Sequence, residues 1–133
     1  MPSVVFVCVA NSFRSQMAEA IAKQRGSSQW EIWSAGSHPS GRVHPMAVHM
    51  MEELGLEMAK HRSKGLAELP AKLWDYVVTM GCEDRCPMLD AKHKLAWDIP
   101  DPAGLPVEEV RRIREQIAGL VGELLSQAGV QRS

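Results

Sequence analysis

Hydrophobic and polar residues follow one another along the chain in a pattern that predicts strands and helices in alternation. A β-branched and aromatic run at residues 4–8 predicts a strand covered on both faces. Residues 14–25 place apolar side chains at helical spacing before Gly26, which predicts a helix with a glycine stop. Residues 30–34 alternate apolar and polar side chains, which indicates a second strand. The first part of the chain therefore predicts a strand, a helix and a strand in direct succession.

The rest of the chain continues this alternation. From Pro45 onward, methionine and leucine recur at helical spacing, and we expect these methionines to pack in the core. Residues 74–80 predict a third strand, residues 95–97 a short fourth strand, and residues 107–125 an amphipathic helix. This order predicts one α/β domain over residues 1–133, a four-stranded parallel sheet with helices on both faces.

Composition and charge exclude several classes of protein. The chain has 15 Lys and Arg against 16 Asp and Glu, and 45% of its residues are hydrophobic. It can therefore bury a core, and it lacks the basic excess that nucleic-acid binding needs. The longest apolar run, residues 4–10, is far shorter than a membrane span of about 20 residues, and no basic segment precedes it. We expect a cytoplasmic monomer, whose three cysteines point to thiol chemistry or metal binding rather than to a disulfide scaffold.

The segment between the first strand and the first helix carries the candidate chemistry. Its sequence is Cys8-Val9-Ala10-Asn11-Ser12-Phe13-Arg14-Ser15. A loop that leads into a helix N-terminus directs backbone N–H groups at its centre, where a tetrahedral oxyanion can bind, and Arg14 adds a bidentate fork. The same positive potential favours the thiolate of Cys8, so Cys8 is the candidate nucleophile, with Asn11 and Ser15 as candidate loop-stiffening and thiolate-binding groups. The alternative is that Cys8 is a small buried hydrophobic residue at the end of a strand.

These residues resemble those of a known family. The chain is similar over nearly its whole length to the low-molecular-weight protein tyrosine phosphatases and to the arsenate reductases built on the same fold. The resemblance rests on four segments: Cys8-x-x-Asn11-Ser12-x-Arg14-Ser15-Gln16-Met17-Ala18-Glu19, Ser34-Ala35-Gly36, Val77-Val78-Thr79-Met80 and Asp98-Ile99-Pro100-Asp101-Pro102-Ala103-Gly104. It implies that the loop binds an oxyanion, that Cys8 attacks it and that Asp101 is the general acid. Without the resemblance, Asp101 reads as a turn residue between two prolines.

Two further cysteines distinguish the branches of this family. Cys82 and Cys86 follow the third strand, at the same edge of a parallel sheet as Cys8. Their position suits a relay in which Cys8 attacks arsenate, Cys82 attacks Cys8 and expels arsenite, and Cys86 attacks Cys82. The thioredoxin-coupled arsenate reductases use such a relay, so the resemblance implies arsenate as substrate, thioredoxin as partner and no cofactor. The alternatives are free structural thiols, or half of a zinc site for which only His93 lies nearby in sequence.

Two other functions remain open from the sequence. One is a low-molecular-weight tyrosine phosphatase that hydrolyses phosphomonoesters through a Cys8 phosphocysteine. Ala103-Gly104 stand where the phosphatases carry aromatic residues, and Phe13 stands where they tend to carry a second cysteine. These differences favour the reductase, with residual phosphatase activity compatible with either branch. The other function is a sensor module that binds the oxyanion without turnover.

The residues that would bind a potassium ion are incomplete. The chain resembles some arsenate reductases at Asn11, Glu19 and Ser34, which help to hold potassium there. Those proteins complete the site with an Asp after His-x-Ser, whereas this chain has Lys64. We expect the ammonium of Lys64 to replace the ion, and we predict no metal requirement. The five histidines are expected to be structural or solvated, and Arg111, Arg112 and Arg114 are expected to form a solvated, salt-bridged face with neighbouring glutamates.

Overall fold

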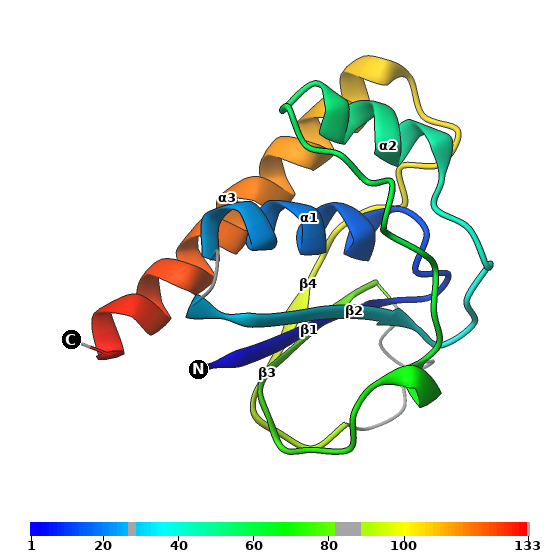
Figure 1. The fold of residues 1–133 in the computed structure, drawn as a ribbon. Helices are drawn as coiled ribbons and strands as arrows, with labels where there is room; N and C mark the ends of the chain where they lie inside the picture. The colour runs from blue at the N-terminus through cyan, green and yellow to red at the C-terminus, as the bar shows by residue number, and fades with distance from the viewer. Residues whose placement is uncertain (27–28, 82–88, 133) are drawn as a thin grey trace.

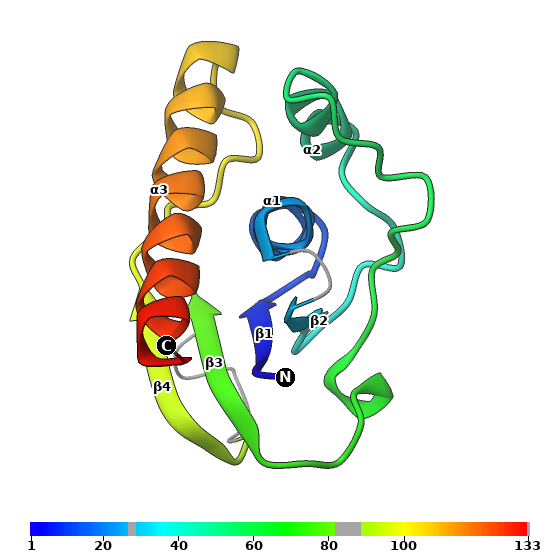
Figure 2. The ribbon, with the colours of Figure 1, turned by 60° about the vertical axis from the view of Figure 1, so that its left-hand side comes forward.

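The protein is built around one parallel sheet. The computed structural model describes residues 1–26, 29–81 and 89–132. Four strands, in the spatial order β2-β1-β3-β4, are all parallel (Figure 1). The strands are β1 (Ser3–Cys8), β2 (Glu31–Gly36), β3 (Trp74–Met80) and β4 (Ala91–Trp97). The helices are α1 (Arg14–Gly26), α2 (Pro45–Glu52), α3 (Val107–Arg132) and the short 3₁₀ helix η2 (Leu66–Glu68). The predicted four-stranded parallel sheet is confirmed; of the helices expected on both faces, the three α-helices lie on one face and, among the described residues, only η2 lies on the other (Figure 2).

The sheet buries side chains on both of its faces. Val4 and Phe6 of β1 belong to the core that the sheet shares with α1, α2 and α3, which lie together on one face (Figure 2). Val5 and Val7 point to the opposite face, where they pack in a second cluster that Leu66 of η2 adjoins. Successive strand residues alternate between faces, so the apolar run of β1 serves both layers. Every residue of β1 is buried, as its sequence predicts for a central strand.

The methionines of α2 pack in the core, as their spacing predicts. Met50 and Met51 are fully buried, together with Met17 of α1 and Met80 of β3. Unbranched thioether side chains adapt their shape to the irregular space between helices and sheet. Methionine therefore fills much of the space between the helices and the sheet.

The fourth strand is longer than the sequence predicts. It runs from Ala91 to Trp97, whereas the pattern indicated only residues 95–97. Lys92, His93 and Lys94 are exposed, because β4 is an edge strand. It pairs with β3 on one side, and among the described residues no strand pairs with it on the other. Pairing with β3, rather than hydrophobic patterning, therefore specifies the first half of this strand.

One arginine of α3 does not lie on the solvated face that the sequence predicts. Arg114 is only 9% exposed, and its Nη1 donates to Oε1 of Glu53 at 2.6 Å, at the end of α2. Arg111 forms a second ion pair with Glu53, with Nη2 2.7 Å from Oε2. These contacts hold α2 against α3. Arg111 and Arg112 do pair with glutamates on their own helix, as predicted.

We predict that this junction weakens in acid. Hydrogen bonds from Arg111 and Arg114 lower the pKa of Glu53 from 4.5 to about 2. A lowered pKa in the folded state stabilises the fold above the unfolded value and loses that effect as the pH falls. The stability difference between the wild type and Glu53→Gln is therefore expected to be complete at pH 7 and to shrink as the pH falls from about 4.5 towards about 2. Urea unfolding of both proteins across this range measures it, and a difference that does not change with pH would contradict the assignment.

The topology brings distant segments to one edge of the sheet. β1 ends at Cys8, β3 ends at Met80 just before Gly81, and the chain leaves β4 for the segment that contains Asp101. In open α/β folds, ligands bind outside the carboxyl ends of the strands. In the part of the chain that the structure describes, no helix is long and apolar enough to cross a membrane.

Candidate active site

The backbone of the loop after β1 is held with its carbonyl groups facing outward. Each carbonyl from Cys8 to Phe13 accepts a hydrogen bond from a group outside this segment. In chain order the donors are Ser37 N, His38 N, Ser40 N, Gln16 Nε2, His44 N and Met17 N, at 2.8–3.3 Å. The carbonyl and N–H of one peptide unit point in opposite directions, so the N–H groups of residues 9–14 turn toward the centre of the loop. This is the arrangement that binds an anion at a helix N-terminus.

Asn11 fixes the shape of this loop from within the core. It is fully buried and has a positive φ of 49°, which asparagine tolerates better than most residues. Its Oδ1 accepts from Lys64 N at 2.9 Å and from Gln16 Nε2 at 3.0 Å. Its Nδ2 donates to the hydroxyls of Ser15 at 2.8 Å and Ser34 at 3.0 Å. The side chain therefore uses both of its donor hydrogens and its acceptor, which supports the stiffening role predicted for it.

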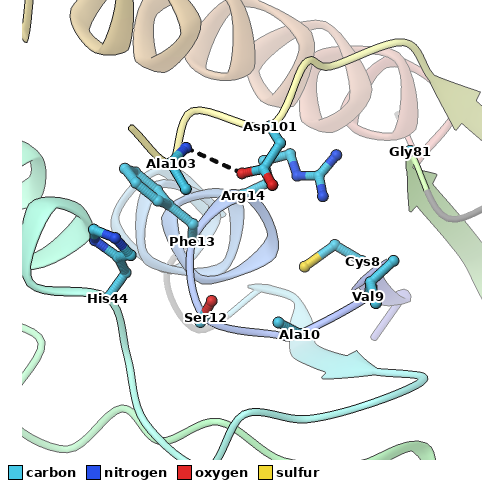
Figure 3. Close-up of a pocket in the computed structure, with 10 residues that line it drawn as sticks. All are labelled: Cys8, Val9, Ala10, Ser12, Phe13, Arg14, His44, Gly81, Asp101 and Ala103. Carbon is cyan, nitrogen blue, oxygen red and sulfur yellow. Dashed lines mark hydrogen bonds between the residues drawn. The ribbon is translucent and has the colours of Figure 1, made fainter. Parts of the chain in front are cut away.

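Ser15 is placed to stabilise a thiolate at Cys8. The two side chains are 2.9 Å apart, Sγ to Oγ. Since the Ser15 hydroxyl already accepts from Asn11, its one hydrogen is available to donate to the sulfur. Cys8 is 2% exposed, and its sulfur points into the cavity (Figure 3). A sulfur that receives a hydrogen bond at the end of a loop of inward N–H groups has the environment of a reactive cysteine.

One cavity gathers most of the residues predicted for the site. It has a volume of about 410 Å³ and is lined by Cys8, Val9, Ala10, Ser12, Phe13, Arg14, His44, Gly81, Asp101 and Ala103 (Figure 3). Asn11 and Ser15 lie buried behind this lining. The nucleophile, the arginine and the acid predicted from sequence therefore border the same space. The predicted relay residues Cys82 and Cys86 lie outside the described residues.

Arg14 is positioned by the ends of two strands. Its Nη1 donates to the carbonyl of Ile99 at 3.1 Å, in the segment after β4. Gly81, which follows β3, has a φ of 81°, and a Cβ there would lie 2.3 Å from Arg14 Nη1. The absence of a side chain at residue 81 thus leaves the space that the guanidinium occupies.

Asp101 lies on the opposite wall of the cavity from the loop residues Ala10 and Ser12 (Figure 3). It is exposed, and its Oδ1 accepts from the backbone N–H of Ala103 at 3.0 Å. This short turn holds the carboxylate between Pro100 and Pro102, whose rings restrict the backbone. The geometry agrees with an acid that serves a group bound above Cys8.

Sequence reasoning missed three residues at this site: Gly81, His44 and Gly36. His44 was expected to be structural or solvated, yet it lines the cavity and stacks on Phe13, with ring centroids 4.6 Å apart. Its Nδ1 also accepts from Met46 N at 3.0 Å and so caps α2. Gly36 lies so close to the loop that a Cβ would be 2.6 Å from the carbonyl oxygen of Val9. Gly36 could have been found from the sequence, because it belongs to the Ser34-Ala35-Gly36 motif on which the family resemblance rests. The stacking of His44 on Phe13 could not, because it depends on tertiary contacts.

The side chain of Lys64 stands beside Glu19 and Ser34. Its Nζ is 3.5 Å from Glu19 Oε1 and 3.4 Å from Ser34 Oγ, and the residue is 8% exposed. Burial raises the pKa of Glu19, but hydrogen bonds from Lys23 and Ser34 and the charge of Lys64 bring it below its ordinary value. Glu19 is therefore ionised and already paired with cations. These residues do not fit a monovalent metal ion, because an ammonium group contacts the same oxygens.

We predict that potassium does not affect this protein. The ammonium of Lys64 supplies the positive charge next to Glu19. Exchanging sodium for potassium in the buffer therefore neither adds nor removes an interaction at this position. Catalytic turnover is expected to be equal in KCl and NaCl at the same ionic strength. A severalfold increase in potassium would contradict the replacement of the ion by Lys64.

Comparison with known proteins agrees with this geometry. Residues 3–133 match the low molecular weight phosphotyrosine protein phosphatase family, and the chain belongs to that family. Both arsenate reductases and phosphatases are among the similar proteins. An arsenate reductase of Staphylococcus aureus (strain Newman) is 39% identical over 119 residues, which cover 86% of this chain and 89% of that protein. The family predicted from the sequence motifs is confirmed.

Solved structures of arsenate reductases are also similar to this chain. An arsenate reductase in the phosphate binding state is similar with a TM-score of 0.86 and 34% identity, covering 96% of this chain and 98% of that chain. A thioredoxin-dependent arsenate reductase of Corynebacterium glutamicum is similar with a TM-score of 0.82 and 34% identity. The match covers 98% of this chain and 63% of that longer one. The predicted fold is confirmed by these neighbours.

Proposed function

We propose that this protein is an arsenate reductase that uses thioredoxin as its electron donor. The observation that carries the proposal is the single cavity bordered by Cys8, Arg14 and Asp101 at the end of β1. Its similarity to arsenate reductases over most of the chain supports arsenate as the substrate. The thioredoxin-dependent relative supports thioredoxin as the partner. A cytoplasmic setting, where thiols stay reduced, suits this chemistry, and one chain supplies the whole cavity, so we propose a monomer.

Substrate binding follows from the charges and donors of the loop. Arsenate is a tetrahedral anion, and the inward N–H groups of residues 9–14 donate to its oxygens. Arg14 adds charge-assisted hydrogen bonds from the side of β3. The anion is thereby held with its central atom above the sulfur of Cys8. Attack then proceeds within a bound complex rather than between two diffusing species.

The first chemical step forms a sulfur–arsenic bond. The Cys8 thiolate attacks arsenic, an arsenic–oxygen bond breaks, and the oxygen leaves as water after it accepts a proton from Asp101. Ser15 stabilises the thiolate before attack through its hydroxyl. The product is a covalent adduct in which arsenic is still pentavalent.

The second and third thiols complete the reduction in this proposal. Cys82 attacks the sulfur of Cys8, the sulfur–arsenic bond breaks, and its electron pair reduces arsenic to the trivalent state, so that arsenite leaves. Cys86 then attacks Cys82, which frees Cys8 and forms a Cys82–Cys86 disulfide. Thioredoxin returns this disulfide to two thiols and supplies the two electrons consumed. These roles rest on the sequence and on the resemblance.

A phosphatase is the second candidate function. Family membership supports it, because a thiolate, an arginine and an acid around one anion also suffice to hydrolyse a phosphomonoester. That reaction needs Cys8, Arg14 and Asp101 but neither Cys82 nor Cys86. The two functions therefore differ in their dependence on the second and third cysteines.

The experiment follows arsenate-dependent oxidation of NADPH with thioredoxin and thioredoxin reductase. The wild type is compared with Cys82→Ser and Cys86→Ser, and hydrolysis of p-nitrophenyl phosphate by all three serves as the control. We expect that only the wild type reduces arsenate and that any phosphatase activity is the same in all three proteins. Phosphate ester hydrolysis without arsenate reduction in the wild type would favour the phosphatase.

A further inference from the structure

A second cavity shares no lining residue with the one at Cys8 and adjoins the segment that supports residues 8–15, which we call the oxyanion loop. Its volume is about 270 Å³, and it is lined by Glu19, Lys23, Ile32, Trp33, Lys60, His61, Arg62 and Lys64. Four of these side chains are lysine or arginine, and one is a carboxylate. Lys23, Lys60 and Arg62 are exposed, whereas Lys64 and Glu19 are buried in the floor. The cavity combines a buried polar floor with a cationic rim.

The positive charge of this cavity is only partly balanced. Glu19 accepts from Lys23 at 2.5 Å and from Lys64 at 3.5 Å, so one carboxylate faces two ammonium groups. Arg62 pairs with Glu68, which is not part of the lining, and no ion pair involves Lys60 in the described part of the chain. Burial lowers the pKa of His61, which favours its uncharged ring, and an imidazole supplies no negative charge to balance the cations. An anion in this cavity relieves the mutual repulsion of its cations.

The wall of the cavity is bonded directly to the oxyanion loop. Gln16 Nε2 donates both to the carbonyl of Arg62 at 2.9 Å and to the carbonyl of Asn11 at 3.1 Å. Lys64 N donates to Asn11 Oδ1 at 2.9 Å. Ser63 Oγ donates to the carbonyl of Ala10 at 2.8 Å. Arg62 and Lys64 thus line the cavity, while the segment 62–64 is hydrogen-bonded to the loop.

We propose that this cavity is a second anion site, which takes a small multivalent phosphate-type anion and strengthens oxyanion binding at Cys8 when it is occupied. An anion that bridges Lys23, Lys60 and Arg62 fastens residues 60–64 to α1. Since residues 62–64 carry the hydrogen bonds that orient Ala10 and Asn11, the loop is then better ordered before its own anion binds. Linkage requires the converse as well: an oxyanion in the loop strengthens binding in the second cavity by the same factor.

The test uses tripolyphosphate as the probe and amide NMR shifts as the readout. Sodium chloride keeps the ionic strength constant, so that general screening does not imitate binding. The variant Lys60→Gln/Arg62→Gln removes two charges from the rim and leaves the Arg62 carbonyl in place. Lys92→Gln/Lys94→Gln removes the same charge from the exposed edge strand β4 and is the matched control. Phosphate is titrated separately with and without tripolyphosphate to measure its affinity for the loop.

The proposal predicts tripolyphosphate shifts at residue 23 and residues 60–64 in the wild type. Its affinity should fall by about tenfold or more in Lys60→Gln/Arg62→Gln and by less than about twofold in the control. Tripolyphosphate should tighten phosphate binding at least about twofold in the wild type but not in the rim variant. Shifts confined to residues 9–14, equal affinity in the rim variant, or unchanged or weaker phosphate binding would overturn the proposal. None of these measurements requires arsenate turnover, so their outcome is separate from that of the proposed function.

Discussion

Replacing Cys8 with serine is expected to reduce arsenite formation to background, a loss on the order of 10⁴-fold or more. A serine hydroxyl is not ionised at neutral pH and is a far weaker nucleophile toward arsenic than a thiolate. Every later step of the proposed relay requires the sulfur–arsenic bond that Cys8 forms. The rate is measured as arsenite released per chain in the presence of thioredoxin.

The control for this variant is its affinity for phosphate. Serine is close in size to cysteine, and the inward N–H groups and Arg14 do not depend on the sulfur. Phosphate should therefore still bind to Cys8→Ser, and the fold should keep its circular dichroism spectrum. Arsenite formation that survives the substitution would assign the attack to another thiol.

Gly81→Ala is expected to weaken oxyanion binding by about ten- to a hundredfold, which corresponds to the loss of hydrogen bonds from a charged donor. A Cβ at residue 81 would lie 2.3 Å from Arg14 Nη1, which is closer than real contacts allow. The guanidinium is the end of a flexible side chain, so it moves aside instead of disrupting the fold. The dissociation constant of phosphate, measured by calorimetry, reports the displacement of Arg14.

Gly55→Ala is a matched control for this prediction. Gly55 also has a positive φ, of 76°, but a Cβ there meets no atom within 4 Å. Both substitutions therefore impose backbone strain, and both are expected to cost stability of about 1 kcal/mol. Only Gly81→Ala should weaken phosphate binding. Equal phosphate affinities in the two variants would contradict the role given to the space at Gly81.

The oxyanion loop was predictable because its chemistry is local. Cys8 ends a strand with an unmistakable apolar pattern, and Arg14 begins a helix six residues later. A loop that leads into a helix N-terminus already predicts inward N–H groups, and hydrogen bonds from residues 37–44 to its carbonyls hold that direction in the fold. Asp101 could not be predicted in this way, because no sequence pattern near it indicates that it lies close to the loop. Only the resemblance to a known family assigned it to the site.

The features that sequence reasoning missed depend on contacts between distant residues. His44 meets Phe13 through a ring contact, and Arg114 meets Glu53 across two helices. The first half of β4 is exposed and polar, so pairing with β3 rather than burial determines it. Hydrophobic periodicity reports burial along one element, whereas these interactions arise only when elements come together.

The central claim is tested most directly by one turnover without thioredoxin. The reduced protein is mixed with excess arsenate, arsenite is counted, and the remaining thiols are alkylated before disulfides are mapped by mass spectrometry. The relay predicts one arsenite per chain, a Cys82–Cys86 disulfide and an alkylated Cys8. Three alkylated cysteines and no arsenite, with the fold and phosphate binding intact, would contradict the assignment of this protein as an arsenate reductase.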